Sequence, residues 1–217
     1  MLIIDPADCA AVLERCRGAA TVTALLTHEH FDHISGLNKL RELRRWNLSP
    51  EFGEHQKDYA IEINENMEFP CLVVAGEICS KRIQDVRENM SVYADVLAEL
   101  AEKQLVGPVE PFTCQEADIT FKDYYSFCWL GHTVDLFATP GHSAGSCCIR
   151  VDDFLFVGDS VLENNLMVKF PGSNKKLYQS VTVPLLEKLL GNRVTSVYPG
   201  HGDVMNCEFA LKTIKNM

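Results

Sequence analysis

The feature that most constrains the fold is a cluster of histidines directly after a short apolar segment. The sequence VTALLTHEHFDHISG places His28, His30, Asp32 and His33 behind the apolar residues 22–26, and the whole chain holds only seven histidines. A continuous apolar run bounded by polar residues predicts a buried strand. Ligand-type side chains therefore stand at the carboxyl end of that strand, where the binding sites of α/β sheets are commonly found.

The spacing within this cluster is suited to metal binding. In extended backbone, residues two apart face the same way, so His28 and His30 can reach one ion. The chain then turns into a helix, which lets Asp32 and His33 face a second point nearby. Imidazole and carboxylate are ligands of zinc and of similar transition metals. A solvated helix start is the alternative, and it fits a single histidine better than it fits this cluster.

Three later segments also place a ligand-type residue in a glycine-containing loop after an apolar strand. They are ATPGHSAGS with His142, FVGDS with Asp159 and VYPGHGD with His201. Glycine permits the tight backbone that brings such loops close to an ion. Five of the seven histidines thus lie where a sheet offers a binding edge.

Helical and strand patterns mix along the whole chain. Helices are expected at 7–17, after His33, and at 80–104, 179–190 and 207–216, and strands at 22–26, 71–75, 119–121, 125–130, 133–138, 146–151, 154–157 and 195–199. This mixture predicts a layered α/β fold with helices covering sheet. The 217 residues suit one domain, with an insert at about 46–70 and an extra helical region at about 80–105.

Composition narrows the class of protein. A formal charge of −10 argues against tracking a nucleic-acid backbone, and no apolar run reaches the length that spans a bilayer. The start of the chain lacks the basic flank and cleavage pattern of a secretory signal. The nine cysteines, with no CxxC pair, are expected to be reduced and mostly buried. We therefore expect a cytoplasmic protein that acts neither on nucleic acid nor on a membrane.

In their order along the chain, HxHxDH, TPGHSxGS, GD and YPGHG resemble the metallo-β-lactamase superfamily, and the resemblance runs from Ile3 to about Glu208. It implies an αββα sandwich with metals at one edge. It also implies which residues hold the metals: His28, His30 and His142 the first, Asp32, His33 and His201 the second, with Asp159 bridging both. Asp5, in LIIDP, matches an early acidic position whose hydrogen bond orients a ligand histidine.

The resemblance further implies a hydrolase with two divalent cations, zinc in the first place and iron or manganese as alternatives. A bridging hydroxide would cleave an ester, thioester, lactone, lactam or phosphodiester, with Asp32 and Asp159 as catalytic residues. An aspartate at position 159 resembles the hydroxyacylglutathione hydrolase and lactonase type. The helical domain that binds glutathione in that hydrolase has no counterpart after the last ligand, which disfavours that particular activity.

Two functions of other classes stay open: a mononuclear-iron oxidoreductase resembling the persulfide dioxygenases, and a metal-binding interaction module without catalysis.

The strands that precede the LIIDP-like strand in the superfamily are shortened here, and an exposed sheet edge predicts a homodimer. In the superfamily the loop after the GD motif often contacts substrate. Lys169, Asn174 and Lys175 are therefore expected to bind a carboxylate or phosphate, with a solvated turn as the alternative.

Overall fold

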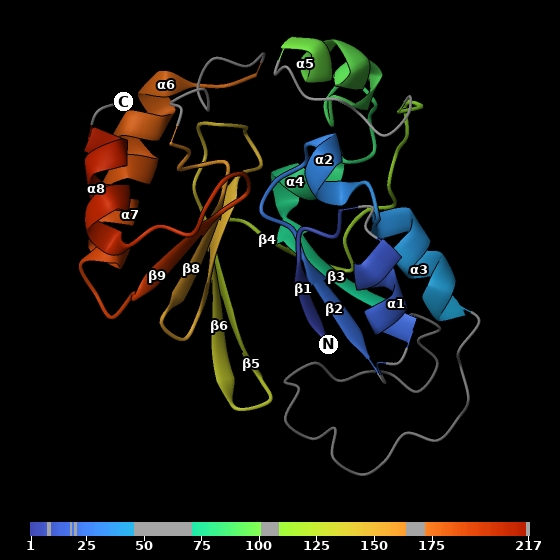
Figure 1. The fold of residues 1–217 in the computed structure, drawn as a ribbon, viewed down its shortest axis with the longest axis horizontal. Helices are drawn as coiled ribbons and strands as arrows, with labels where there is room; N and C mark the ends of the chain where they lie inside the picture. Colours follow the sequence, from blue (N-terminus) through green and yellow to red (C-terminus); the bar gives the residue numbers. More distant parts are fainter. Residues whose placement is uncertain are drawn as a thin grey trace. The chain divides into compact units, whose positions relative to one another are not determined.

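The computed structural model describes residues 1–7, 10–17, 19, 21–45, 71–100, 109–163 and 172–215. The chain divides into two compact units, one of Met1–Asn47 with Phe69–Thr120 and one that contains Phe121–Met217. A four-stranded and a five-stranded sheet form their frameworks (Figure 1). The insert expected at 46–70 lies outside the described residues, and the single-domain organisation stays a prediction.

The first unit is built on the sheet of order β1-β2-β3-β4. Its strands are β1 (Leu2–Ile4), β2 (Val22–Leu25), β3 (Cys71–Gly76) and β4 (Ile119–Phe121). β1, β2 and β3 run parallel, and every residue of β2 is buried, as is usual for a central parallel strand. β1 and β2 point the same way. Asp5, which follows β1, and His28, which follows β2, therefore lie at the same edge of this sheet.

Within the described residues of the first unit, the helical segments are α1 (Ala10–Arg17), α2 (Phe31–Ile34), α3 (Leu37–Arg45), α4 (Glu77–Arg82), η2 (Ser91–Tyr93) and α5 (Ala94–Leu100). α1 packs on α3, whose Leu37 and Leu40 are fully buried in the apolar cluster of this unit. The helical region expected at 80–104 is interrupted, since α4 ends at Arg82. Asn89 stabilises the break, because its side chain donates to Phe112 O at 2.7 Å and accepts from Ser91 N at 2.9 Å.

The second unit is built on the sheet of order β5-β6-β7-β8-β9. Its strands are β5 (Tyr124–Trp129), β6 (His132–Ala138), β7 (Cys147–Val151), β8 (Phe154–Gly158) and β9 (Ser196–Pro199). Neighbours are antiparallel except β8 and β9, which are parallel. β6, β8 and β9 therefore all end at the same edge of this sheet. A turn that contains Asp152 and Asp153 joins β7 to β8, with Asp152 at a φ of 51°.

Helices α6 (Lys175–Leu177), α7 (Val183–Leu190) and α8 (Cys207–Lys215) complete the second unit, together with the π-helical turn η3 (Tyr178–Thr182). Apolar residues of α7 and α8 share one cluster with Leu155 of β8 and Val197 of β9. The helix expected at 179–190 starts with the π-turn, in which Val183 N–H donates to Tyr178 O. Pro184 lacks the N–H that a regular helix would need at the next position, which favours this wider turn.

The strands expected from the sequence are confirmed, with boundaries moved by a residue or two. Six of the eight described cysteines are buried and none of the eight forms a disulfide, as expected for reduced thiols. Within the described part of the chain, no helix has the length and apolar character needed to cross a membrane.

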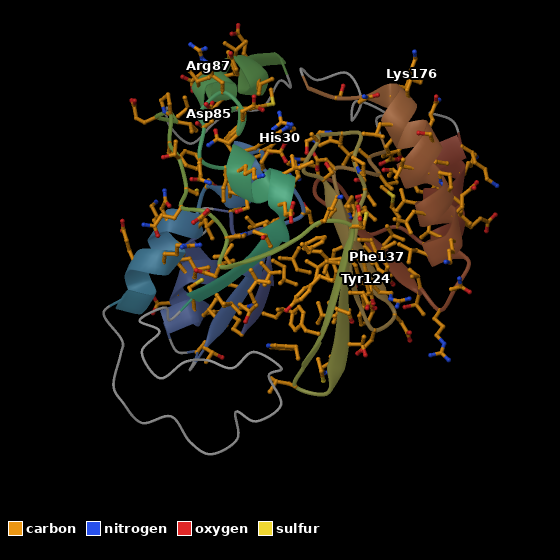
Figure 2. All side chains as sticks on the ribbon, turned by 180° about the vertical axis from the view of Figure 1, so that it is seen from behind. His30, Asp85, Arg87, Tyr124, Phe137 and Lys176 are labelled. Carbon is orange, nitrogen blue, oxygen red and sulfur yellow. The ribbon has the colours of Figure 1, made fainter. Side chains whose placement is uncertain are left out.

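An ionic cluster around the buried Asp135 stabilises the sheet of the second unit. Asp135 accepts hydrogen bonds from the Tyr124 hydroxyl at 2.6 Å and from Nη2 and Nε of Arg150 at 2.7 and 3.2 Å. Tyr124 and Phe137 are paired across β5 and β6 (Figure 2), and the Arg150 guanidinium lies over the Phe137 ring. Burial favours the neutral acid, but the hydrogen bonds from Tyr124 and Arg150 outweigh it and hold the pKa of Asp135 below its ordinary value.

We therefore expect Asp135→Asn to destabilise the protein in a pH-dependent way. A lowered folded-state pKa means that the carboxylate's contribution is present above the ordinary value of 3.8 and is lost as the pH falls through the folded value. At neutral pH the variant should lose about 2 kcal/mol of unfolding free energy, and this gap should narrow as the pH falls below the ordinary value of 3.8. Urea denaturation across pH checks this, with the exposed Asp153→Asn as control; a gap that is the same at every pH would contradict it.

Candidate functional site

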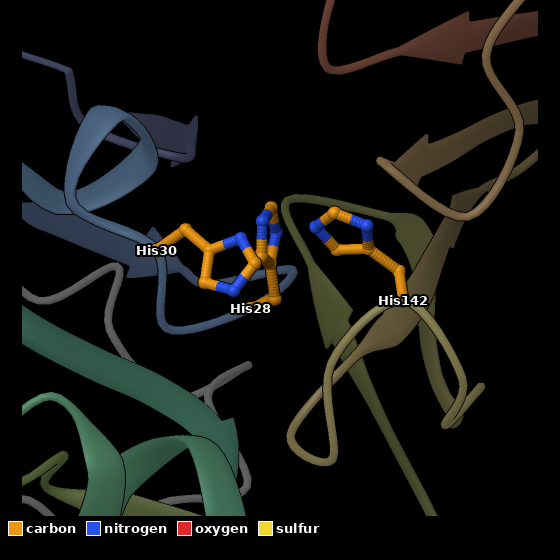
Figure 3. A group of neighbouring side chains, drawn as sticks. All are labelled: His28, His30 and His142. Carbon is orange, nitrogen blue, oxygen red and sulfur yellow. The ribbon is translucent and has the colours of Figure 1, made fainter. Parts of the chain in front are cut away.

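The histidine cluster of the first unit lies on the loop after β2 and in the short helix α2. Figure 3 draws His28 and His30 on this loop. The ring centroid of His28 lies 4.6 Å from that of His30 and 4.1 Å from that of His33. All three imidazoles are buried, whereas the side chain of Asp32, in the first turn of α2, is 39% exposed. The residues expected to be ligands in this unit are thus gathered at the carboxyl end of β2.

Asp5 anchors this cluster from the end of β1. Its carboxylate accepts hydrogen bonds from the backbone N–H and the hydroxyl of Thr27 at 2.7 and 2.6 Å and lies 2.8 Å from Nδ1 of His33. Possible ligand atoms of Asp5, His28 and His33 lie within 4.8 Å of one another. A histidine that donates Nδ1–H to a carboxylate presents Nε2 to a metal, which is the usual arrangement around metal-bound imidazoles. Asp5 has a φ of 52°, a conformation unfavourable for a residue with a side chain.

Glu29, between two expected ligands, is a residue that the sequence analysis missed. Its side chain is fully buried, and Oε1 lies 3.1 Å from Nε of Arg82 at the end of α4; Arg82 also pairs with Glu88. Phe31 N–H donates to Asn89 O at 2.8 Å, so the break after α4 also holds the backbone next to His30. The sequence offered one signal for its separate role: in extended backbone successive side chains alternate, so Glu29 faces away from both neighbouring histidines.

The second unit brings together three residues from separate loops. His142 follows β6, Asp159 follows β8 and His201 follows β9; Figure 3 includes His142. Oδ2 of Asp159 lies 3.7 Å from Nε2 of His142 and 3.7 Å from Nε2 of His201. Gly200 N–H donates to Gly158 O at 2.8 Å and ties the last two loops together. Asp159 is therefore placed between two imidazoles that lie 59 positions apart in the sequence (142 and 201).

Of the residues expected to contact substrate, the structure describes Asn174 and Lys175. Asn174 caps α6, because its side chain accepts a hydrogen bond from Leu177 N–H at 3.0 Å. Lys175 and Lys176 are exposed on α6, and Figure 2 labels Lys176 at the surface. Lys169 lies outside the described residues. Binding of substrate by Lys169, Asn174 and Lys175 stays a prediction.

A buried thiol lies beneath the loops of the second unit. Sγ of Cys148 is 3.4 Å from Oγ1 of Thr139, which in turn is 3.4 Å from Oγ of Ser160. Burial raises the pKa of the Cys148 thiol to about 12. The thiol therefore stays protonated near neutral pH in the metal-free protein, so it is not poised as a nucleophile.

Sequence comparison finds a relative over most of the chain. No protein-family model matches the sequence. A hydroxyacylglutathione hydrolase of Klebsiella pneumoniae is 26% identical over 184 residues, which are 82% of this chain and 49% of that protein. The chain thus spans about half the length of the curated relatives it matches.

Structure comparison finds neighbours over nearly the whole chain. A metallo-β-lactamase superfamily protein of Sulfolobus tokodaii superposes with a TM-score of 0.65 at 19% identity, covering 99% of this chain and 75% of that one. A protein solved in a di-iron-bound form superposes with a TM-score of 0.55 at 18% identity, covering 97% and 86% of the two chains.

Proposed function

We propose that this chain, which has the metallo-β-lactamase fold predicted from its motifs, is a metal-dependent hydrolase with a dinuclear centre. The position of Asp159 carries the proposal. Its carboxylate lies 3.7 Å from a nitrogen of each of two histidines from different loops. Such a carboxylate is suited to share its oxygens between two cations.

The donor set fits divalent transition metals. It consists of imidazoles and carboxylates, the ligands of catalytic zinc and of non-haem iron. The hydrogen bond between Asp5 and His33 at 2.8 Å is of the kind that fixes the orientation of a ligand histidine. Zinc is the first candidate, and iron is the second because one structural neighbour was solved with two irons.

The motif resemblance implies which residues would hold the cations: His28, His30 and His142 the first, Asp32, His33 and His201 the second, with Asp159 shared between them. When bound, the two cations supply a water of lowered pKa and positive charge for a developing oxyanion. The carboxylate of Asp5, 2.8 Å from Nδ1 of His33, would favour the tautomer with its proton on Nδ1, which leaves Nε2 available as a ligand. The ion pair of Glu29 with Arg82 holds the ligand loop in place from its opposite side.

We propose a small acyl compound as substrate, with a thioester as the first class to test. The support is the relative named for hydroxyacylglutathione, a compound that carries its acyl group on a thiol. Lactones, esters, lactams and phosphodiesters contain bonds that the same donors can cleave. The cytoplasmic location and the homodimer stay predictions.

Hydrolysis assays with controlled metal content test the function. Protein loaded with Zn²⁺ or Fe²⁺ is given S-acyl thioesters, lactones, a β-lactam and a phosphodiester. We expect thioester hydrolysis that a chelator abolishes and added metal restores. Persulfide-dependent oxygen consumption with one iron per chain would favour the dioxygenase alternative. Bound metal without turnover of any of these compounds would favour the interaction module, and hydrolysis that survives complete removal of metal would contradict the proposal.

A further inference from the structure

We infer that Tyr178 and Thr182, in the π-turn between α6 and α7, are positioning residues for His142 and Asp159. The inference rests on the proposed function for the role of these two ligands, but it assigns residues outside the ligand set. Tyr178 lies 36 positions after His142 and 19 after Asp159 along the sequence. Its connection with both loops arises only from the fold.

The hydroxyl of Tyr178 holds the loop that carries Asp159. Tyr178 is completely buried, and its O–H donates to Ser160 O at 2.8 Å. Ser160 directly follows Asp159, and its own N–H donates to Val157 O at 2.9 Å. The backbone on the carboxyl side of Asp159 is therefore fixed at two points, one of which is the tyrosine hydroxyl.

The body of Tyr178 supports the loop that carries His142. Gly141 has a φ of 152°, and a Cβ built there would lie 2.5 Å from Cβ and 2.8 Å from Cδ2 of Tyr178. The backbone beside His142 thus packs directly on the tyrosine, at a position where only glycine fits. The same tyrosine therefore contacts the backbone next to both expected ligands.

Thr182 and Asn174 add two more bonds to the loop of His142. Oγ1 of Thr182 donates to Pro140 O at 2.7 Å, and Asn174 N–H donates to Gly141 O at 2.7 Å. Thr182 is fully buried, like Tyr178. In a π-turn, residues four apart lie near the same side, and such turns are often found at functional sites. The segment 174–182 thus donates hydrogen bonds to backbone oxygens of both loops, in addition to the packing of Tyr178 on Gly141.

Two conservative variants test this role, each with a matched control in the same unit. Tyr178→Phe and Thr182→Val each remove one hydroxyl that donates to a ligand loop. Tyr124→Phe removes the hydroxyl that bonds Asp135 at 2.6 Å, and Thr213→Val removes the hydroxyl that bonds Phe209 O at 2.9 Å. The measured quantities are the Zn²⁺ affinity, from competition with a chelator, the visible spectrum of the Co²⁺-loaded protein and the midpoint of thermal unfolding of the metal-free protein.

We expect both test variants to bind Zn²⁺ roughly 10-fold more weakly and to shift the Co²⁺ spectrum. The controls should lower the unfolding midpoint by a similar amount while leaving affinity and spectrum unchanged. Test variants that match the wild type in affinity and spectrum would overturn the inference. Should Tyr178→Phe fail to fold, Thr182→Val decides alone, because it leaves Tyr178 and both of its contacts unchanged. A wild-type chain that binds no metal refutes the proposed function and the inference together, whereas wild-type-like variants of a metal-binding chain refute the inference only.

Discussion

Replacing Asp159 with alanine is expected to lower kcat/KM for hydrolysis by about a thousandfold or more. The carboxylate lies 3.7 Å from both His142 and His201, so its loss removes the group proposed to contact both cations. The remaining donors would bind the second metal weakly, because the carboxylate between His142 and His201 would be missing. Steady-state kinetics and metal analysis of the same preparation check the two effects together.

Asp153→Ala is the matched control for this change. Asp153 is exposed in the turn between β7 and β8, in the same unit as Asp159. It should keep the kcat/KM and the metal content of the wild type. Turnover that survives Asp159→Ala unaltered would show that a two-metal mechanism is wrong for this chain.

Gly36→Ala should have the largest effect on stability among the glycines near the cluster of the first unit. A Cβ at position 36 would lie 2.6 Å from Ala7 O and 2.8 Å from Pro6 O, both of them backbone atoms. Gly36 N–H also donates to Pro6 O at 2.8 Å, so the close approach cannot relax without breaking that bond. We expect a loss of about 3 kcal/mol of unfolding free energy and a fall of roughly 10 °C in the unfolding midpoint.

The same change should also weaken metal binding, because the displaced segment carries Asp5, the hydrogen-bond partner of His33. Gly191→Ala is the control, since Gly191 has a φ of −77° and its nearest contact would be 3.3 Å from Glu187 O. Calorimetry of both variants measures the midpoints. A Gly36→Ala protein as stable as Gly191→Ala would contradict the close approach of residues 5–7 to Gly36.

The sequence alone was sufficient for the strands and for the loops that carry expected ligands. A continuous apolar run in the sequence indicates a buried strand such as β2, and the histidines directly follow this run. Parallel pairing of β1 with β2 and of β8 with β9 then brings together residues that follow different strands. Asp5 was found only through the motif resemblance, because an isolated aspartate after a three-residue strand has no pattern of its own.

The residues that support the ligand loops could not be predicted, because their roles depend on contacts between distant positions. Arg82 meets Glu29 across 53 positions, and neither residue stands in a periodic pattern that would indicate burial. In the sequence, Tyr178 is an aromatic residue near an expected helix start, with no sign of a special role. Its support of the two loops is visible only in the structure, from its contact with Gly141 and its hydrogen bond to Ser160. The π-turn itself escaped prediction because helical periodicity does not separate a 3.6-residue turn from a wider one.

The most direct test of the dinuclear centre is the number of metal ions bound per chain, measured by elemental analysis of wild-type protein and of Asp159→Ala after equilibration with Zn²⁺. We expect about two ions for the wild type and about one for the variant. A wild-type chain that saturates with one ion or none, or a variant that still binds the same number as the wild type, would contradict this expectation.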